Sequence, residues 1–132
     1  MKDSNKGQVI IYQTEDGQTK LEVQFKNETV WLTIDQMSEL FQRDRSTISK
    51  HIKAVYEDGE LIKSTTCAKF AYVVNRGIRG LIEDEIDCFN LDMIISVGYR
   101  VHSHRGVQFR MWATSVLKDL KKNPISKGEI RP

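Results

Sequence analysis

The chain has 132 residues, of which 39% are hydrophobic and 29% are charged, with a formal net charge of +2. This length supports one domain with a single core, and so small a net charge does not by itself demand a nucleic-acid partner. No apolar run approaches the roughly 20 residues that cross a bilayer, and the N-terminus lacks the apolar core of a signal peptide, so we expect a cytoplasmic protein. We expect one domain over residues 8–121, between a flexible N-terminus (1–7) and a flexible tail or linker (122–132).

Two or three short strands are expected before the first helix. Residues 9–14 and 21–25 are extended runs on either side of Glu15-Asp16-Gly17, and residues 30–32 form another. Because the third run leads directly into a helix start, we expect this small antiparallel sheet to pack against the helices that follow. Its predicted role is structural.

Residues 32–55 (LTIDQMSELFQRDRSTISKHIKAV) have the pattern of two short helices joined by a tight turn, which is the signature of a helix-turn-helix. Thr33 and Gln36 form a capping-box pattern that starts the first helix near Ile34, and Asp44 is the N-cap candidate of the second. Ser38 is small enough for another helix to approach closely. The expected buried positions are Ile34, Met37, Leu40 and Phe41 in the first helix and Ile48, Ile52 and Val55 in the second.

The turn Gln42-Arg43 contains no glycine, although such turns often use one where the backbone needs a positive φ. Either Gln42 is strained, or the turn is a variant. Arg43 adds positive charge at this point.

The second helix presents polar groups away from its apolar stripe. At about 100° per residue, Ser46, Lys50 and Lys53 lie opposite that stripe, with Thr47 and Ser49 on the flanks. Such groups can reach base edges and phosphates, and four basic residues and one acid lie between Arg43 and Lys53. The predicted groove-facing positions are Ser46, Thr47, Ser49 and Lys50, and the predicted phosphate contacts are Arg43, Arg45 and Lys53. The alternative is a solvated amphipathic helix in an ordinary helix pair.

Residues 66–74 and 81–89 predict a β-hairpin around the glycine-containing turn 75–80. The expected cross-strand pairs are Phe70–Ile86, Val74–Ile82 and Lys69–Asp87. In this register Cys67 and Cys88 point to opposite faces and are free thiols, whereas a register slipped by one would place them opposite each other. Arg76 and Arg79 at the tip can touch DNA. The outgoing strand is acidic (Glu83, Asp84, Glu85 and Asp87) and is not expected to contact phosphate.

Two helices are predicted after the hairpin. Asn90 caps the first, which carries Leu91, Met93, Ile94, Ile95 and Val97 and ends near Gly98. A polar turn over residues 103–106 leads to the last helix, whose apolar face is core or a dimer surface and comprises Phe109, Trp112, Ala113, Val116, Leu117 and Leu120.

A second basic cluster lies near these helices, since no acid occurs between Met93 and Lys118. One interpretation is that this cluster contacts phosphate, with Arg100 and Arg105 as the predicted DNA contacts. The alternative is that Arg110 pairs with a hairpin acid and that the other basic side chains are simply solvated. The cluster comprises Arg100, His102, His104, Arg105, Arg110 and Lys118.

Several motifs together resemble the RhuM family of DNA-binding "virulence" proteins: DRSTISKHI, GEL, STTCAKFA and above all NLDMIISVGYRVHSHRGVQFRMWATSVL. The resemblance covers most of the chain, and its last part is more distantly similar to the N-terminal DNA-binding domains of the Bro and KilA families of phages and viruses. It implies a DNA-binding module, associated with mobile elements, that in many such chains precedes a C-terminal effector region.

The leading hypothesis is an α+β fold, a winged helix-turn-helix-like domain with a small N-terminal sheet, a hairpin wing and two C-terminal helices. It would act as a transcriptional regulator or mobile-element-associated module, binding double-stranded DNA as a homodimer, with the 44–56 helix in the major groove and the 76–79 tip as a wing. The alternative is a protein-interaction or self-assembly module that keeps the fold without binding DNA. Catalysis is the third hypothesis, because three histidines, two cysteines and the acidic strand could supply ligands. Their spacing lacks a zinc signature, so we expect no catalysis, no cofactor and no metal.

Overall fold

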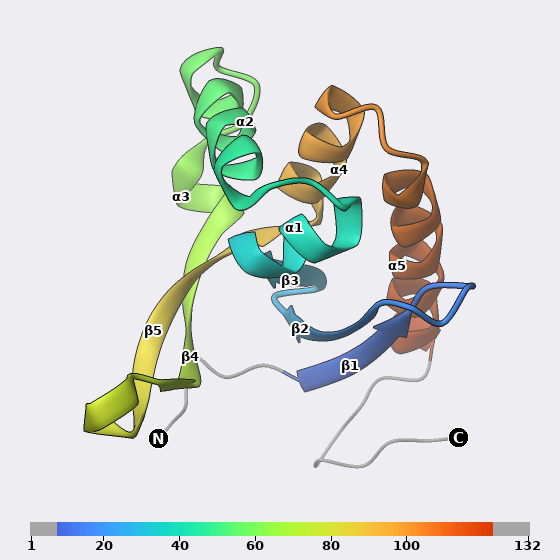
Figure 1. Ribbon diagram of the computed structural model, residues 1–132. Coiled ribbons are helices and arrows are strands. Elements are labelled where there is room, and N and C mark those ends of the chain that lie inside the picture. Colours follow the sequence, from blue (N-terminus) through green and yellow to red (C-terminus); the bar gives the residue numbers. More distant parts are fainter. Residues whose placement is uncertain (1–7, 123–132) are drawn as a thin grey trace.

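The computed structural model describes residues 8–122. The predicted flexible N-terminus (1–7) and the predicted tail (122–132), except Lys122 at the end of the last helix, lie outside the described residues. The fold is α+β: one five-stranded antiparallel sheet in the order β1-β2-β3-β5-β4, with five α-helices and one 3₁₀ turn, in the described range (Figure 1). In chain order the elements are β1 (Gln8–Gln13), β2 (Lys20–Lys26), β3 (Thr29–Thr33), α1 (Ile34–Phe41), α2 (Arg45–Glu57), α3 (Lys63–Thr66), β4 (Cys67–Asn75), η1 (Gly77–Arg79), β5 (Leu81–Asn90), α4 (Leu91–Arg100) and α5 (His104–Lys122).

The N-terminal strands and the hairpin form one sheet, which corrects the prediction of a separate small sheet beside a hairpin. β3 pairs with β5 through Leu32 opposite Phe89 and Thr33 opposite Cys88. Leu32 and Phe89 are both buried in the main core, so this pairing places apolar partners under the helices. The first helix therefore starts from a strand in the middle of the sheet.

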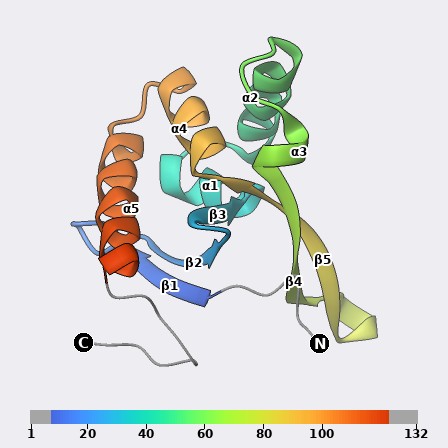
Figure 2. The same ribbon diagram turned by 180° about the vertical axis from the view of Figure 1, so that it is seen from behind.

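The helices gather on one side of the sheet, and the distal part of the β4–β5 hairpin extends beyond them (Figures 1 and 2). We call this projecting part, residues 71–85, the arm. The main core lies between the sheet and the helices, where fully buried side chains from both meet. They include Val23, Val30, Leu32, Met37, Leu40, Phe41, Ile48, Val55, Met93 and Phe109.

Both predicted helix starts are confirmed. Thr33 accepts a hydrogen bond from the Gln36 backbone N–H at 3.0 Å, and the Gln36 side chain accepts one from the Thr33 N–H at 3.0 Å. Asp44 caps α2. All of the predicted stripe is buried except Ile34, which is partly buried against the same core.

The turn between α1 and α2 has the backbone that a glycine would favour, because Gln42 is left-handed (φ 55°, ψ 48°). The prediction of strain at this position is therefore supported by geometry. Ser38 serves this turn: its hydroxyl donates to the Arg43 carbonyl at 2.6 Å, and its carbonyl accepts from the Arg43 N–H at 3.1 Å. The turn is thus held closed by hydrogen bonds despite its unfavourable residue.

Replacing Gln42 with glycine should raise the free energy of unfolding by about 0.5–1 kcal/mol, because glycine adopts the left-handed region without a Cβ clash. Chemical denaturation measures the change. Gln42→Ala is the control, since it removes the side chain but keeps the Cβ and should give no gain. A glycine variant no more stable than the wild type would show that this turn carries no strain.

The predicted hairpin register is confirmed at every pair: Phe70 lies opposite Ile86, Val74 opposite Ile82, and Lys69 opposite Asp87. Lys69 Nζ donates to Asp87 Oδ1 at 2.8 Å. Cys67 and Cys88 face opposite sides of the sheet and are free thiols, as predicted. Burial raises the pKa of the Cys88 thiol to about 12, so this thiol stays protonated at neutral pH.

A short helix that was not predicted, α3, joins α2 to the hairpin. The Tyr56 hydroxyl at the end of α2 lies 2.9 Å from the Thr66 hydroxyl, and Asn90 Nδ2 donates to the Thr65 carbonyl at 3.3 Å. These bonds connect α2, α3 and the start of α4. They fix α2 relative to the base of the arm.

The fourth helix begins as predicted at the Asn90 cap but continues to Arg100, past the predicted end at Gly98. Gly98 allows a close approach of helices instead. A Cβ on it would lie 3.1 Å from two atoms of the Phe41 ring and 3.5 Å from the Cα of Gly106. The glycine therefore serves the packing of α1, α4 and α5.

Gly98→Ala should lower the free energy of unfolding by about 1–2 kcal/mol, since crowding against a fully buried Phe41 ring outweighs the gain in helix propensity. Thermal and denaturant unfolding measure it. A double-mutant cycle supplies the control: on a Phe41→Leu background the same alanine should cost little. A stabilising Gly98→Ala would refute the packing role.

The last helix starts at His104, inside the predicted polar turn, so the turn is shorter than predicted and lies at residues 101–103. Its predicted apolar face packs within the chain. The Trp112 ring lies 4.9 Å from Tyr12 of β1 and 5.4 Å from Phe109, between ring centroids. Phe109 and Ala113 of this face are therefore core and Trp112 packs against it, whereas Val116, Leu117 and Leu120 are only partly buried.

Candidate functional site

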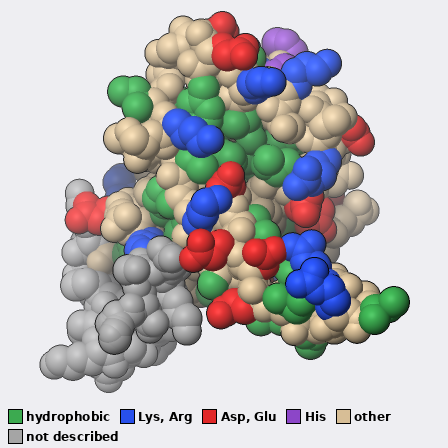
Figure 3. Space-filling model, turned by 90° about the vertical axis from the view of Figure 1, so that its left-hand side faces the viewer, with side chains coloured by type: hydrophobic (Ala, Val, Ile, Leu, Met, Phe, Trp, Pro, Cys, Tyr) green, Lys and Arg blue, Asp and Glu red, His purple; other side chains and the backbone are tan. Residues whose placement is uncertain are grey.

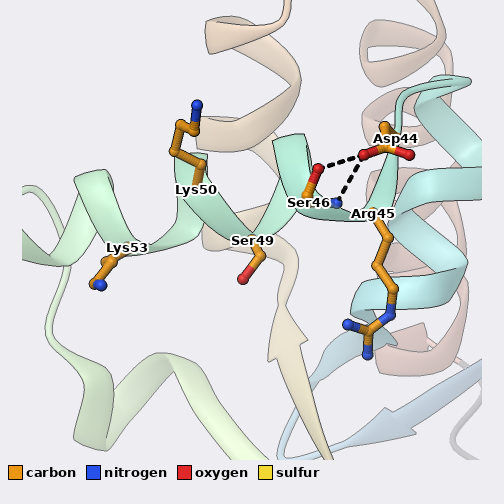
Figure 4. A pocket seen from close by; sticks show the side chains of 6 residues that line it. All are labelled: Asp44, Arg45, Ser46, Ser49, Lys50 and Lys53. Carbon is orange, nitrogen blue, oxygen red and sulfur yellow. Dashed lines mark hydrogen bonds between the residues drawn. The ribbon is translucent and has the colours of Figure 1, made fainter.

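The outward face of α2 is the most coherent polar surface that the sequence predicted. Ser46, Ser49, Lys50 and Lys53 are exposed, and with Asp44 and Arg45 they line one shallow, open hollow (Figure 4). Figure 4 shows Lys50 along one edge of this face and Arg45 along the other. Thr47 is half-buried on the flank. We call the six lining residues the α2 face.

The α2 face is ordered at the start of the helix. Asp44 accepts hydrogen bonds from the Ser46 hydroxyl and from the Ser46 backbone N–H, the latter at 3.3 Å. These bonds hold the pKa of Asp44 below its usual value. The cap therefore stabilises the fold above the ordinary aspartate pKa of about 3.9, and this contribution is lost as the pH falls through the lowered value.

The basic side chains of the α2 face make few ion pairs with the other described residues. Arg45 Nε donates to Asp35 Oδ1 at 2.6 Å, but both side chains are well exposed, and such surface pairs contribute little. Lys50 and Lys53 have no ion-pair partner among residues 8–122. Two ammonium groups and one exchangeable guanidinium are thus available to an anion.

His51 follows Lys50 on α2 and is half-buried. Burial, with the nearby positive charges of Arg100 and Lys50, lowers its pKa. The imidazole is therefore neutral at pH 7, where it can exchange hydrogen bonds but adds no charge.

Three of the predicted DNA-contacting arginines hold the fold together. Arg43 donates to the Phe41 carbonyl at 3.1 Å and to the Val101 carbonyl at 2.8 Å. Arg105 donates to the Leu40 carbonyl through Nε and to the Thr19 hydroxyl at 2.7 Å. These bonds tie the helix-turn-helix to α4, to α5 and to the β1–β2 turn.

Arg100 is the third of these arginines. It pairs with Asp58 at 2.8 Å and with Glu60 at 3.4 Å, both just beyond the end of α2. Arg110, weighed as the partner of a hairpin acid, is exposed and makes no ion pair within the described range. Two members of the second basic cluster, Arg100 and Arg105, are therefore engaged within the chain, and Asp58 and Glu60 are partners that the sequence analysis did not predict.

The predicted tip residues lie at the end of the arm. Arg76 pairs with Asp84, whereas Arg79 is exposed and has no ion pair in the described part of the chain. The arm and α2 both lie on the left-hand side of Figure 1, which faces the viewer in Figure 3. There, Asp and Glu side chains lie between the basic side chains of the upper part and those of the arm. The structure thus brings the α2 face and the tip to one side of the molecule, separated by acids.

No group of three or more His, Cys, Asp or Glu side chains within residues 8–122 is arranged to hold a metal ion. Over the same residues, no helix is both long and apolar enough to cross a membrane.

The fold and this surface define a class: an α+β domain in which a helix pair with a short left-handed turn displays one basic, hydroxyl-rich helix face. Residues 65–126 match the family model described as the Virulence protein RhuM family. The resemblance seen in the sequence is confirmed there, whereas DRSTISKHI and GEL lie outside the matched residues. No curated protein and no solved structure matches the chain.

Proposed function

We propose that this protein binds double-stranded DNA through the α2 face. The carrying observation is that Ser46, Ser49, Lys50 and Lys53 share one open surface on which the lysines lack internal partners. Hydroxyl and ammonium groups along one side of a helix can donate to phosphates and to base edges in the major groove. We assign Ser46, Ser49 and Lys50 to the groove and Arg45 and Lys53 to phosphates, with the half-buried Thr47 at the margin.

The order of elements supports a winged helix-turn-helix architecture for this role. The α1–α2 pair lies in the chain between β3 and β4, and β5 lies between these two strands in the sheet. The β4–β5 hairpin then stands in the position of a wing. In this proposal the protein is the DNA-binding module of a transcriptional regulator or of a mobile-element-associated protein, and it binds without catalysing a reaction.

A specific binder of this size would gain reading residues by dimerising on a palindrome. The Trp112 side of α5 is occupied by Tyr12, but Val107 and Met111, one helical turn apart on α5, are exposed. We propose this exposed side of the same helix as the dimer contact.

Selection of bound sequences from a random pool of duplex DNA tests the proposal directly, and a palindromic product would report the dimer. The selected duplex should then bind with steep salt dependence. With about four cationic side chains at the DNA, each displacing counterions (Arg45, Lys50, Lys53 and Arg79), affinity should fall roughly 100-fold between 50 and 200 mM salt. Isothermal titration or fluorescence anisotropy measures the slope.

No enrichment from the pool, or an affinity indifferent to salt, would refute DNA binding. The protein-interaction alternative would then be favoured, since the acidic outgoing strand β5, with Glu83 and Asp87, is suited to a basic protein partner. An arm that binds such a partner while the lysines of the α2 face are dispensable would establish that alternative.

A further inference from the structure

The apex of the arm exposes a large apolar side chain. Ile78 is 106% exposed, and behind it Val73 and Leu81 are 67% and 74% exposed. Val73 and Leu81 lie on the same face of the hairpin. Val73 and Asn75 are two residues apart on β4 and point the same way, and Leu81 is the cross-strand partner of Asn75. Exposed apolar groups gathered at a projecting point mark a contact with another molecule.

The turn that carries Ile78 is well ordered. The Arg76 N–H donates to the Gly80 carbonyl at 2.8 Å, the Gly80 N–H to the Gly77 carbonyl at 2.8 Å, and the Gly77 N–H to Asn75 Oδ1 at 2.8 Å. Gly77 and Gly80 both have a positive φ, which lets the chain reverse within this narrow tip. Ile78 is therefore held outward by backbone hydrogen bonds.

The apex is basic although the strand behind it is acidic. Residues 75–82 contain Arg76 and Arg79 and no acid. Arg76 hydrogen-bonds to Asp84, which holds the pKa of that carboxyl low and offsets its charge. A polyanion is thus attracted to the apex and repelled along the outgoing strand, so contact is confined to the tip.

We propose that the apex of the arm enters the minor groove beside the site read by α2, and that Ile78 wedges between two base pairs there and bends the duplex. This inference rests on the proposed function. The minor groove of B-DNA is about 6 Å wide, too narrow for two strands about 4.8 Å apart with their side chains. An apolar wedge between stacked bases opens this groove and kinks the duplex toward the major groove.

The remaining tip residues fit this arrangement. Arg79 next to the wedge meets the negative potential of the groove, while Leu81, beside the tip, contacts the sugars of the opened walls. β4 has nine residues and spans about 30 Å from α3, next to the end of α2, to the tip, whereas the minor groove beside an occupied major groove lies about half of a roughly 34 Å turn away. The tip can therefore reach a minor groove next to the major groove occupied by α2.

DNA bending separates this inference from DNA binding itself. The selected duplex, labelled at its two ends, should show increased energy transfer when the wild-type protein binds. Ile78→Ala should lose the bend while affinity falls no more than about tenfold, and Ile78→Leu should keep it. A 2-aminopurine placed at a flexible TA step beside the α2 site should brighten with the wild type and Ile78→Leu, but not with Ile78→Ala.

An unbent complex of the wild type, or a bend unchanged in Ile78→Ala, would overturn the wedge and leave DNA binding intact. The wedge would also be overturned if Ile78→Ala bends DNA normally but no longer forms a concentration-dependent dimer. The apex would then be a contact between copies of this chain. Failure of the wild type to bind any duplex would remove the proposed function and the wedge with it. Circular dichroism and thermal unfolding should match the wild type, since Ile78 is fully exposed.

Discussion

Replacing Lys50 and Lys53 together with alanine should weaken binding to the selected duplex roughly 100-fold near 0.1 M salt, about tenfold for each lost charge-assisted contact. The slope of log affinity against log salt should fall by about 1.8, because two fewer counterions are released. Both side chains are exposed, so the fold should be unaffected. Anisotropy titrations at several salt concentrations measure the two quantities together.

The matched control is Lys20→Ala with Lys118→Ala, which removes the same charge from exposed positions on β2 and α5. The control should shift affinity only slightly and leave the slope near that of the wild type. If both double variants weaken binding equally, the effect comes from net charge and the α2 face is not the DNA site. Unchanged DNA retention by Lys50→Ala with Lys53→Ala would favour the protein-interaction alternative.

Arg105→Ala should lower the free energy of unfolding by about 3 kcal/mol, because two buried oxygens lose their donor. The carbonyl of the fully buried Leu40 and the hydroxyl of the buried Thr19 both accept from this guanidinium. Arg105→Lys should recover only part of the loss, since an ammonium cannot reproduce the planar fork. Denaturant unfolding gives the free energies.

DNA binding gives a separate test of the predicted phosphate contact of Arg105. In folded protein at low temperature, Arg105→Ala should keep the wild-type salt slope of DNA binding. The control is Arg110→Ala, an exposed arginine on the same helix, which should change stability by less than about 0.5 kcal/mol. A slope reduced by about one, with stability intact, would show that Arg105 contacts phosphate.

Much of the fold was predictable because its determinants are local. The hairpin register follows from a period-two alternation on both sides of one glycine-containing turn, and a slip by one residue would have exposed Phe70. The caps at Thr33, Asp44 and Asn90 likewise depend on side chains that bond to backbone only two or three residues away. These signals are contained within short stretches of sequence.

The hydrogen-bond partners of Arg43, Arg100 and Arg105 were not predictable, because these partners are distant in the chain. Arg105 reaches Thr19 across 86 residues, Arg43 reaches Val101 across 58, and Arg100 reaches Asp58 across 42. A basic residue on an expected surface gives the same local pattern whether it binds phosphate or a carbonyl of its own chain. Gly98 was misinterpreted for the same reason, since only the tertiary structure shows the Phe41 ring against it.

The pairing of β3 with β5 also sets an order of events in folding. Thr33 and Cys88 are 55 residues apart, and the whole helix pair lies in the loop that their pairing closes. Such a long-range contact is costly in entropy and forms late compared with helices and hairpins. During synthesis, α1 and α2 therefore emerge before the strand that anchors them, and the α2 face takes its final orientation only after residue 90 has been made. The segment that matches the RhuM family model, residues 65–126, thus supplies the strand on which the earlier part of the chain completes its fold.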